Sequence, residues 1–183
     1  MSSLEIATQN ETRILSVLVE NKPRVLARVS GLFARRGFNI HSLAVAPTDD
    51  PERSRMTIVV AGDDATVEQM TKQLNKLINV IKITDLDPEV SVQRELMLVQ
   101  VKADPSVRAQ IIEIAGVFRA QVIDVGTETL IVECTGTPEK LHGLEDLLRP
   151  YGVVELVRTG RIAIARGTKA PKLKAVKNKP AAG

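Results

Sequence analysis

The same order of hydrophobic patterns occurs twice along this chain of 183 residues. Each half reads strand, helix, strand, strand, helix, strand, because strand-like apolar runs alternate with stretches whose apolar residues recur at helical spacing. Corresponding landmarks lie 81, 74 and 73 residues apart: Arg13 and Arg94, Gly62 and Gly136, Val80 and Val153. This repeat predicts an α+β fold of two ferredoxin-like βαββαβ units, each an antiparallel sheet with both helices on one face.

The first unit, residues 12–87, opens with an apolar strand over residues 12–20, and Pro23 stands where the first residue of a helix tolerates proline. We expect the helix to start there, with Arg24 right-handed, and to end at Gly37. Strands at 39–47 and 55–62 should follow, then a helix capped by Asp63 or Asp64, and a strand at 79–86. The inner faces of the two helices are predicted as Val25, Leu26, Val29, Leu32 and Phe33, and as Val67, Met70, Leu74, Leu77 and Ile78.

The second unit, residues 92–165, repeats that order. Strands are predicted at 94–103, 120–127 and 129–136, and one last strand over 152–165. Helices should begin at Asp104-Pro105 and at Thr137-Pro138, the second with Leu141, Leu144, Leu147 and Leu148 inward. The sheet faces away from the helices are apolar enough to need cover, which predicts self-association into at least a dimer.

The charge of the chain is unevenly distributed. Residues 166–183 hold six Lys or Arg and no acid, which leaves 19 basic against 22 acidic residues in the rest. This basic tail is expected to be solvated, or else to touch an acidic partner. The N-terminus lacks the pattern of a secretory signal, no apolar run is long enough to span a membrane, and Cys134 is the only cysteine, so we predict a cytoplasmic protein with Cys134 as a small buried hydrophobe.

Several function classes find no support in the residues. Aromatic residues make up 2% of the chain, and residues 54–62 contain none, which disfavours an RNA-binding sheet. His41 and His142 lie 101 residues apart, so they predict no metal site. No cofactor site or catalytic group is predicted either. His41 is expected at a surface or interface, and the pairs Asp49-Asp50 and Asp63-Asp64 in turns or caps.

A binding role is possible at the two ends of the first helix. The free N–H groups at the start of the helix can hold a carboxylate, with Asn21 adding an amide donor. Asn39 offers a carbonyl acceptor for an ammonium group, and Val25, Leu26 and Ile40 are apolar. Together these groups describe a branched-chain amino acid. The alternative is that both asparagines only cap and turn the chain.

Several segments carry a family resemblance: RILSVLVENKPRVLARVSGLFARRGFNIHSLAVAPTDDPERSRMTIVV, EQMTKQLNKLINVIKI, QRELMLVQVKA, FRAQVIDV and ELVRTGRIAIARG. Together they cover roughly residues 12–167, and they closely resemble the acetolactate synthase (acetohydroxyacid synthase) small subunit. The resemblance implies an N-terminal ACT domain that pairs with a second copy, and a C-terminal ACT-like domain. It also implies a non-catalytic regulatory subunit of branched-chain amino acid biosynthesis. Such a subunit activates the large subunit, which carries thiamine diphosphate, Mg²⁺ and FAD and condenses two pyruvates, and it confers feedback inhibition by valine.

The family's valine site is carried over by matching motifs. It falls on Asn21, Lys22, Pro23, Arg24, Val25 and Leu26 of one subunit and on Asn39 and Ile40 of its neighbour. The chain departs from the family at Arg24, where glycine is usual, and at His41, where an acidic residue is common. An alternative is an ACT-type sensor of amino acids that regulates a different enzyme or a transcription partner.

Overall fold

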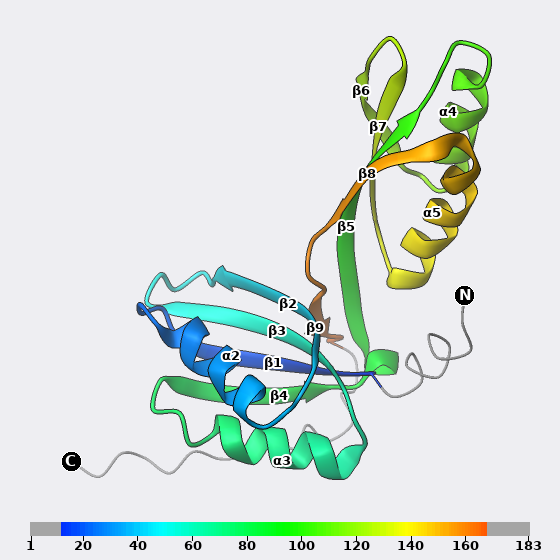
Figure 1. The fold of residues 1–183 in the computed structure, drawn as a ribbon. Coiled ribbons are helices and arrows are strands. Elements are labelled where there is room, and N and C mark those ends of the chain that lie inside the picture. The colour runs from blue at the N-terminus through cyan, green and yellow to red at the C-terminus, as the bar shows by residue number, and fades with distance from the viewer. Residues whose placement is uncertain (1–11, 168–183) are drawn as a thin grey trace. The chain divides into compact units, whose positions relative to one another are not determined.

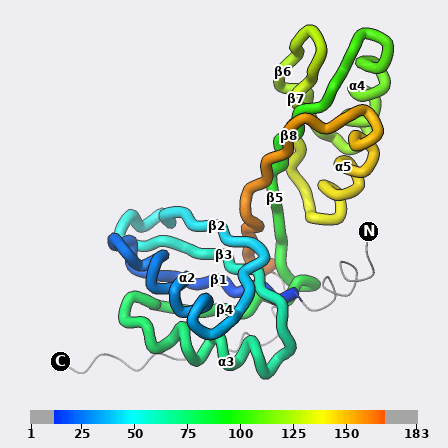
Figure 2. The backbone as a smooth tube through the Cα atoms, viewed as in Figure 1, coloured from blue at the N-terminus to red at the C-terminus, as the bar shows by residue number. Residues whose placement is uncertain are grey.

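The computed structural model describes residues 12–167, which form two compact units (Figures 1 and 2). Unit 1 contains the described residues up to Val92 together with those from Arg161 onward, and unit 2 contains Gln93–Gly160. Residues 161–165, expected in the second unit, therefore group with unit 1. No helix within residues 12–167 is long and apolar enough to cross a membrane.

Unit 1 has the predicted βαββαβ order. Its elements are β1 (Thr12–Glu20), α2 (Val25–Arg35), β2 (Ile40–Pro47), β3 (Arg53–Ala61), α3 (Asp64–Leu74) and β4 (Val80–Leu86). The strands are antiparallel in the order β2-β3-β1-β4. Alternate residues of β1, Leu15 and Val17 among them, pack with Phe33 of α2 and Met70 of α3 in one core. Both helices therefore lie on one face of the sheet.

Unit 2 repeats the arrangement. Its elements follow the short helix η1 (Pro88–Val90) and are β5 (Ser91–Lys102), α4 (Arg108–Val117), β6 (Gln121–Val125), β7 (Thr129–Gly136), α5 (Pro138–Gly152) and β8 (Val153–Arg158). The strand order is β6-β7-β5-β8. Val99 of β5, Ile111 of α4 and Leu144 of α5 share a core with Cys134, which is buried as predicted. The fold class predicted from the repeat is confirmed.

Local signals fixed several of the element ends. Asp63 caps α3 through a hydrogen bond from the Thr66 amide, and Thr137 caps α5 through one from the Lys140 amide. Gly37 ends α2 with φ 70°, the left-handed conformation that glycine adopts readily. Asp64 does not serve as a cap, because it is the first residue of α3, and its carboxylate pairs with Arg13.

Several expectations about the fold are wrong. The last strand is two strands, β8 and β9 (Ile162–Ala165), and β9 pairs with β5. α4 begins at Arg108, beyond the turn at Asp104-Pro105. Leu147 is 50% exposed, since Leu141, Leu144 and Leu148 already define the inner face of α5. Ile78 is 87% exposed because α3 ends at Leu74.

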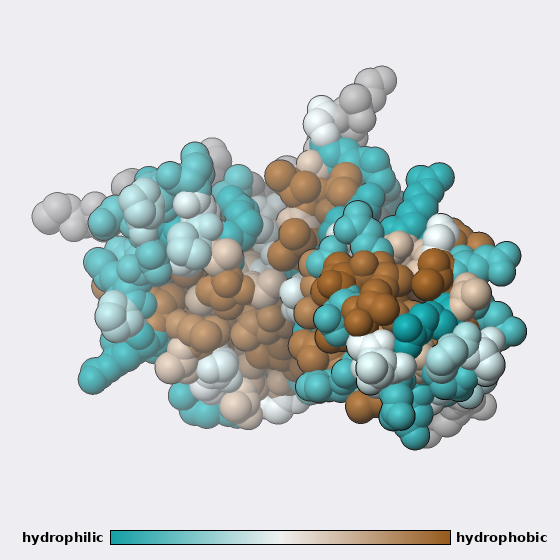
Figure 3. Space-filling model, turned by 90° about the horizontal axis from the view of Figure 1, so that it is seen from above, coloured by the Kyte–Doolittle hydropathy of each residue, from teal (hydrophilic) through white to brown (hydrophobic). Residues whose placement is uncertain are grey.

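The face of the unit 1 sheet away from the helices is covered in part by the chain itself. Ile14, Val59 and Leu86 are buried there against Ala163 and Ala165 of β9. Self-association was predicted to cover this face, and β9 supplies some of that cover within one chain. Other apolar side chains do reach the surface of the molecule (Figure 3).

Candidate functional site

The turn that leads into α2 differs from the one predicted. α2 begins at Val25, so Pro23 lies in the turn before the helix and not at its first position. The Val25 amide donates to the Lys22 carbonyl at 3.4 Å, and Arg24 has φ 70° and ψ −1°. These are the dihedrals of the third residue of a type II turn whose second residue is proline. The expectation that Arg24 is right-handed is therefore wrong.

The left-handed conformation of Arg24 has a physical consequence. For a residue with a Cβ atom it is less stable by about 1–2 kcal/mol, because Cβ approaches the following carbonyl oxygen. Glycine adopts the same conformation without that penalty. The glycine that the family resemblance places at this position is thus the residue that the backbone favours, and Arg24 is the departure.

The first turn of α2 presents free backbone donors. Arg24 caps the helix without a side-chain hydrogen bond, and no acidic residue lies in the first turn. The Arg28 amide donates to the Arg24 carbonyl, but the amides of Leu26 and Ala27 have no hydrogen-bond acceptor within residues 12–167. Exposed N–H groups at the positive end of a helix dipole attract a carboxylate.

Asn21 is held against the loop between β2 and β3. Its amide Nδ2 donates to the Pro51 carbonyl at 2.8 Å, and its backbone N–H donates to the Glu52 carbonyl at 2.8 Å. One side-chain N–H, predicted to meet a ligand, is thus engaged within the protein. The amide group has a second N–H, so Asn21 keeps one donor beyond this contact.

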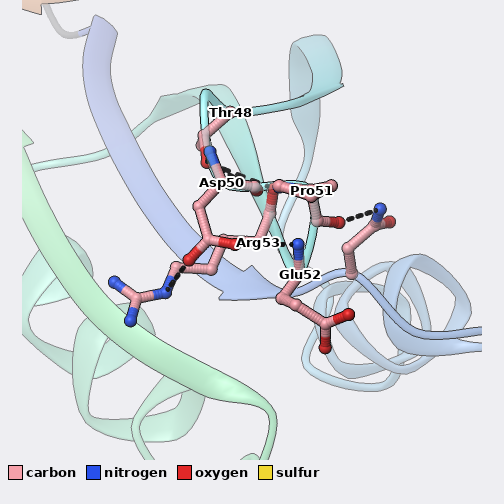
Figure 4. Close-up of polar contacts among 6 residues, drawn as sticks. Thr48, Asp50, Pro51, Glu52 and Arg53 are labelled. Atoms are coloured by element: carbon pink, nitrogen blue, oxygen red, sulfur yellow. Dashed lines mark hydrogen bonds and ion pairs between the residues drawn. The ribbon is translucent and has the colours of Figure 1, made fainter.

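The loop that holds Asn21 is itself well ordered by hydrogen bonds (Figure 4). The Asp50 carboxylate accepts from the Glu52 amide at 3.0 Å and pairs with Arg53 Nε at 3.0 Å. The Thr48 hydroxyl donates to the Asp50 carbonyl at 3.0 Å. Asp50 is therefore a turn residue, as predicted for the Asp49-Asp50 pair.

Lys22 belongs to a chain of polar contacts beside the turn. Its Nζ lies 3.2 Å from the Glu20 carboxylate, which also accepts from Asn79 Nδ2 at 2.6 Å. Asn79 Oδ1 in turn accepts from Arg28 Nη1 at 3.0 Å. The hydrogen bond from Asn79, followed by that from Lys22, holds the pKa of Glu20 below its usual value. Glu20 therefore stays ionised and offsets the charge of Lys22.

The apolar members of the predicted site divide into two groups. Val25 is buried in the core of unit 1, whereas Leu26, predicted on the inner face of α2, is 44% exposed. Ile40 is partly buried and packs against the same core. Leu26 is thus the apolar side chain at the start of α2 that a ligand can reach directly.

Asn39 and Ile40 lie at the far end of α2. α2, with 11 residues at 1.5 Å per residue, is about 16 Å long and separates them from Asn21. The Asn39 side chain is exposed and has no hydrogen-bond partner within residues 12–167. One chain therefore does not bring the two predicted groups together. His41 is exposed, as predicted, and lies at the irregularity where the β2–β3 register shifts between Ile40 and Ser42.

The corresponding turn of unit 2 is closed by its own side chains. The Asp104 carboxylate accepts from the Ser106 amide at 2.8 Å and from the Ser106 hydroxyl at 2.5 Å, which lowers the pKa of Asp104. Arg108 Nη2 donates to the carbonyls of Ala103, Gly126 and Thr127. A carboxylate of the protein thus already lies at the turn before α4, unlike the open turn before α2.

Sequence reasoning missed the contacts made by Pro51, Glu52, Asn79 and Arg28. These residues lie 30 to 59 positions from their partners, so no local pattern indicates them. The antiparallel pairing of β1 with β3, which places Glu20 opposite Arg53, is the signal that points to this loop. Among residues 12–167, no cluster of three or more His, Cys, Asp or Glu side chains is arranged to hold a metal ion.

Two family models match the chain, one for each repeat. The AHAS small subunit-like ACT domain matches residues 15–82, and the small subunit of acetolactate synthase matches residues 94–167. The chain belongs to the acetolactate synthase small subunit family. This assignment confirms the resemblance carried by the sequence motifs, and it gives the first unit the ACT fold.

Individual members of the acetolactate synthase small subunit family are similar over most of their length. The small subunit of Mycolicibacterium smegmatis is 58% identical over 156 residues, which are 85% of this chain and 92% of that protein. A probable small subunit of Archaeoglobus fulgidus is 54% identical over 155 residues, 85% of this chain and 97% of that protein. The crystal structure of the small subunit from Thermotoga maritima has a TM-score of 0.80 at 43% identity, and covers 85% of this chain and 97% of that one.

Proposed function

We propose that this chain is the regulatory subunit that activates the catalytic subunit of acetolactate synthase and confers inhibition by valine. The large subunit carries out the reaction in this proposal, with its thiamine diphosphate, Mg²⁺ and FAD, and condenses two pyruvates into acetolactate. The small subunit supplies no reacting group. It binds valine, the end product of the pathway, and this binding changes the activity of the catalytic subunit.

The observation that carries the proposal is the open turn before α2. The unpaired amides of Leu26 and Ala27 suit the carboxylate of valine, and the second N–H of Asn21 lies beside the same turn. Leu26 is exposed and offers an apolar contact for the isopropyl group. The closed turn of unit 2, which holds Asp104 in the equivalent place, gives a reason for valine to select unit 1.

The ammonium group of valine is assigned to a second copy of the chain. Asn39 and Ile40 lie at the opposite end of α2 from Asn21, so a site that uses both needs Asn39 and Ile40 from a neighbouring subunit. A two-fold dimer places the same pair of segments together twice, because each subunit contributes the start of its α2 to one site and its Asn39 to the other.

Mixing two variants tests this arrangement. In Asn21→Ala and Asn39→Ala homodimers each site lacks one hydrogen bond to a charged group, which weakens valine binding by about ten- to a hundredfold. A heterodimer of the two variants has one doubly altered site and one intact site. Random exchange of subunits therefore restores about a quarter of the wild-type number of tight sites.

Isothermal titration with valine reads both the affinity and the number of sites. Recovery of tight binding after the variants are unfolded and refolded together supports a site shared between subunits. If the mixture binds no better than either variant alone, the two asparagines do not act across a subunit interface, and the assigned site is wrong. A chain carrying both substitutions is the control, because mixing it with either variant restores no intact site.

A further inference from the structure

The chain returns from unit 2 to unit 1 through a short segment, Thr159–Arg166, which we name the return segment. Its first residue is held in unit 2, where the Thr159 amide donates to the Leu96 carbonyl at 2.9 Å and the Thr159 hydroxyl accepts from the Leu96 amide at 3.0 Å. Its third residue is held in unit 1, where the Arg161 amide donates to the Ser42 hydroxyl at 2.7 Å. Only Gly160 separates these two anchors.

The rest of the return segment is firmly seated on unit 1. Ala163 and Ala165 pack on Ile14, Val59 and Leu86, whose side chains are at most 4% exposed. The Arg166 amide donates to the Val90 carbonyl at 3.0 Å. β9 is therefore held near both of its ends, at Arg161 and at Arg166. For this reason a displacement of Ser42 acts on a fixed strand.

Ser42 lies next to the segment assigned to the ligand. It follows Asn39 and Ile40 on β2, and the β2–β3 register shifts between Ile40 and Ser42 at His41. Ser42 pairs with Val59, a member of the apolar cluster beneath β9, so it belongs to the sheet face on which the return segment lies. An irregular register lets the strand end move without sliding the whole of β2.

We propose that the hydrogen bond between Ser42 and Arg161 transmits occupancy of the valine site to unit 2 through the return segment. The inference rests on the proposed function, since it needs a ligand at Asn39 and Ile40. Binding there orders the start of β2 and changes the position of Ser42. Arg161 follows its acceptor, and Gly160 passes the change to Thr159 and hence to β5.

The variant Ser42→Ala tests the link, because it removes the acceptor and leaves the residues of the valine site in place. Valine affinity of the isolated small subunit, measured by titration, should stay within about threefold, whereas the maximal inhibition of the reconstituted holoenzyme by valine should fall at least about twofold. The matched control is Ser16→Ala, which removes a different serine hydroxyl of unit 1, a buried one that accepts from Arg55 Nη1 at 2.9 Å. This control should keep wild-type inhibition, and Ser42→Thr, which retains the hydroxyl, should as well.

Hydrogen exchange of the full-length chain gives a readout independent of activity. Valine should change the exchange of peptides that cover residues 159–166 in the wild type but not in Ser42→Ala. Insertion of two glycines after Gly160 is a second variant that leaves Ser42 intact, and it should also reduce maximal inhibition while preserving valine affinity. This insertion keeps the test decisive where Ser42→Ala fails to fold.

Two results overturn the inference in distinguishable ways. If the wild-type chain does not bind valine, the proposed function and the proposed coupling are both wrong. If the wild type binds valine and inhibits, but Ser42→Ala or the insertion keeps full inhibition and the full change in exchange, the function stands and the coupling through the return segment is wrong.

Discussion

Replacing Arg24 with glycine should stabilise unit 1. Arg24 has φ 70° at the third position of the type II turn before α2, and its side chain makes no capping hydrogen bond that would compensate for the strain. Glycine adopts this conformation freely, so Arg24→Gly removes the steric conflict between the Arg24 Cβ and the following carbonyl oxygen while leaving the turn unchanged.

The size of the effect is a balance of two terms. Relief of the left-handed strain contributes about 1–2 kcal/mol to the free energy of unfolding. The greater freedom of glycine in the unfolded chain offsets this by roughly 0.5–1 kcal/mol. The difference of the two terms spans about 0–1.5 kcal/mol and centres near 0.75 kcal/mol. At about 4–8 °C per kcal/mol for a domain of this size, that central value raises the melting temperature of unit 1 by about 3–6 °C.

Scanning calorimetry of the wild type and of two variants separates strain from side-chain effects. Arg24→Ala also removes the guanidinium but keeps Cβ, and with it the steric conflict, so it should not be more stable than the wild type. Arg24→Gly should be the only one of the two that melts higher. Equal melting temperatures for the glycine and alanine variants would show that the strain relieved is no larger than the roughly 0.5–1 kcal/mol that glycine costs in the unfolded chain, which would contradict the prediction.

Further predictions concern the site, the tail and acid stability. Titration should show valine affinity ten- to a hundredfold lower in Asn39→Ala, and Asn21→Ala should in addition lose about 0.5–1.5 kcal/mol of stability with its bond to Pro51. Arg24→Gly should lower the valine concentration for half-inhibition, because it removes a bulky side chain next to the free amides of α2. Ending the chain at Gly167 removes five lysines and should leave thermal stability and valine response unchanged. The pKa of Asp63 is lowered by its hydrogen bond from Thr66, so its stabilising effect is present above about pH 4 and lost as the pH falls through the lowered folded value; urea unfolding of Asp63→Asn should lack that dependence. Full valine inhibition in Asn39→Ala would contradict these expectations, and so would poor activation by the truncated chain.

The elements that the sequence predicted best are those with strong local patterns. β1 and β7 have the predicted bounds because each is an apolar run between turn signals, and α5 begins where Thr137-Pro138 indicates. Helical spacing also identified most buried positions, Phe33 and Leu144 among them. It failed at Leu147, where an apolar residue lies on the outer face of a helix.

The remaining features depend on contacts between distant residues. Arg24 is an exception, because its positive φ arises within the local turn from Lys22 to Val25, and arginine, unlike glycine, does not indicate that conformation. β9 follows β8 after three residues. It packs on unit 1 through contacts with Ile14, Val59 and Leu86, which are distant in the sequence. The candidate site was predicted from the two helix ends, but the contact of Asn21 with Pro51 requires the folded hairpin.

The most direct test of the central proposal is the rate of acetolactate formation by the large subunit, measured with and without this chain and with and without valine. We predict that the chain raises the rate, that valine lowers it only when the chain is present, and that Asn39→Ala raises the valine concentration for half-inhibition about ten- to a hundredfold while keeping the activation. A large subunit whose rate is unchanged by the chain, or which valine inhibits equally in its absence, would contradict the regulatory role.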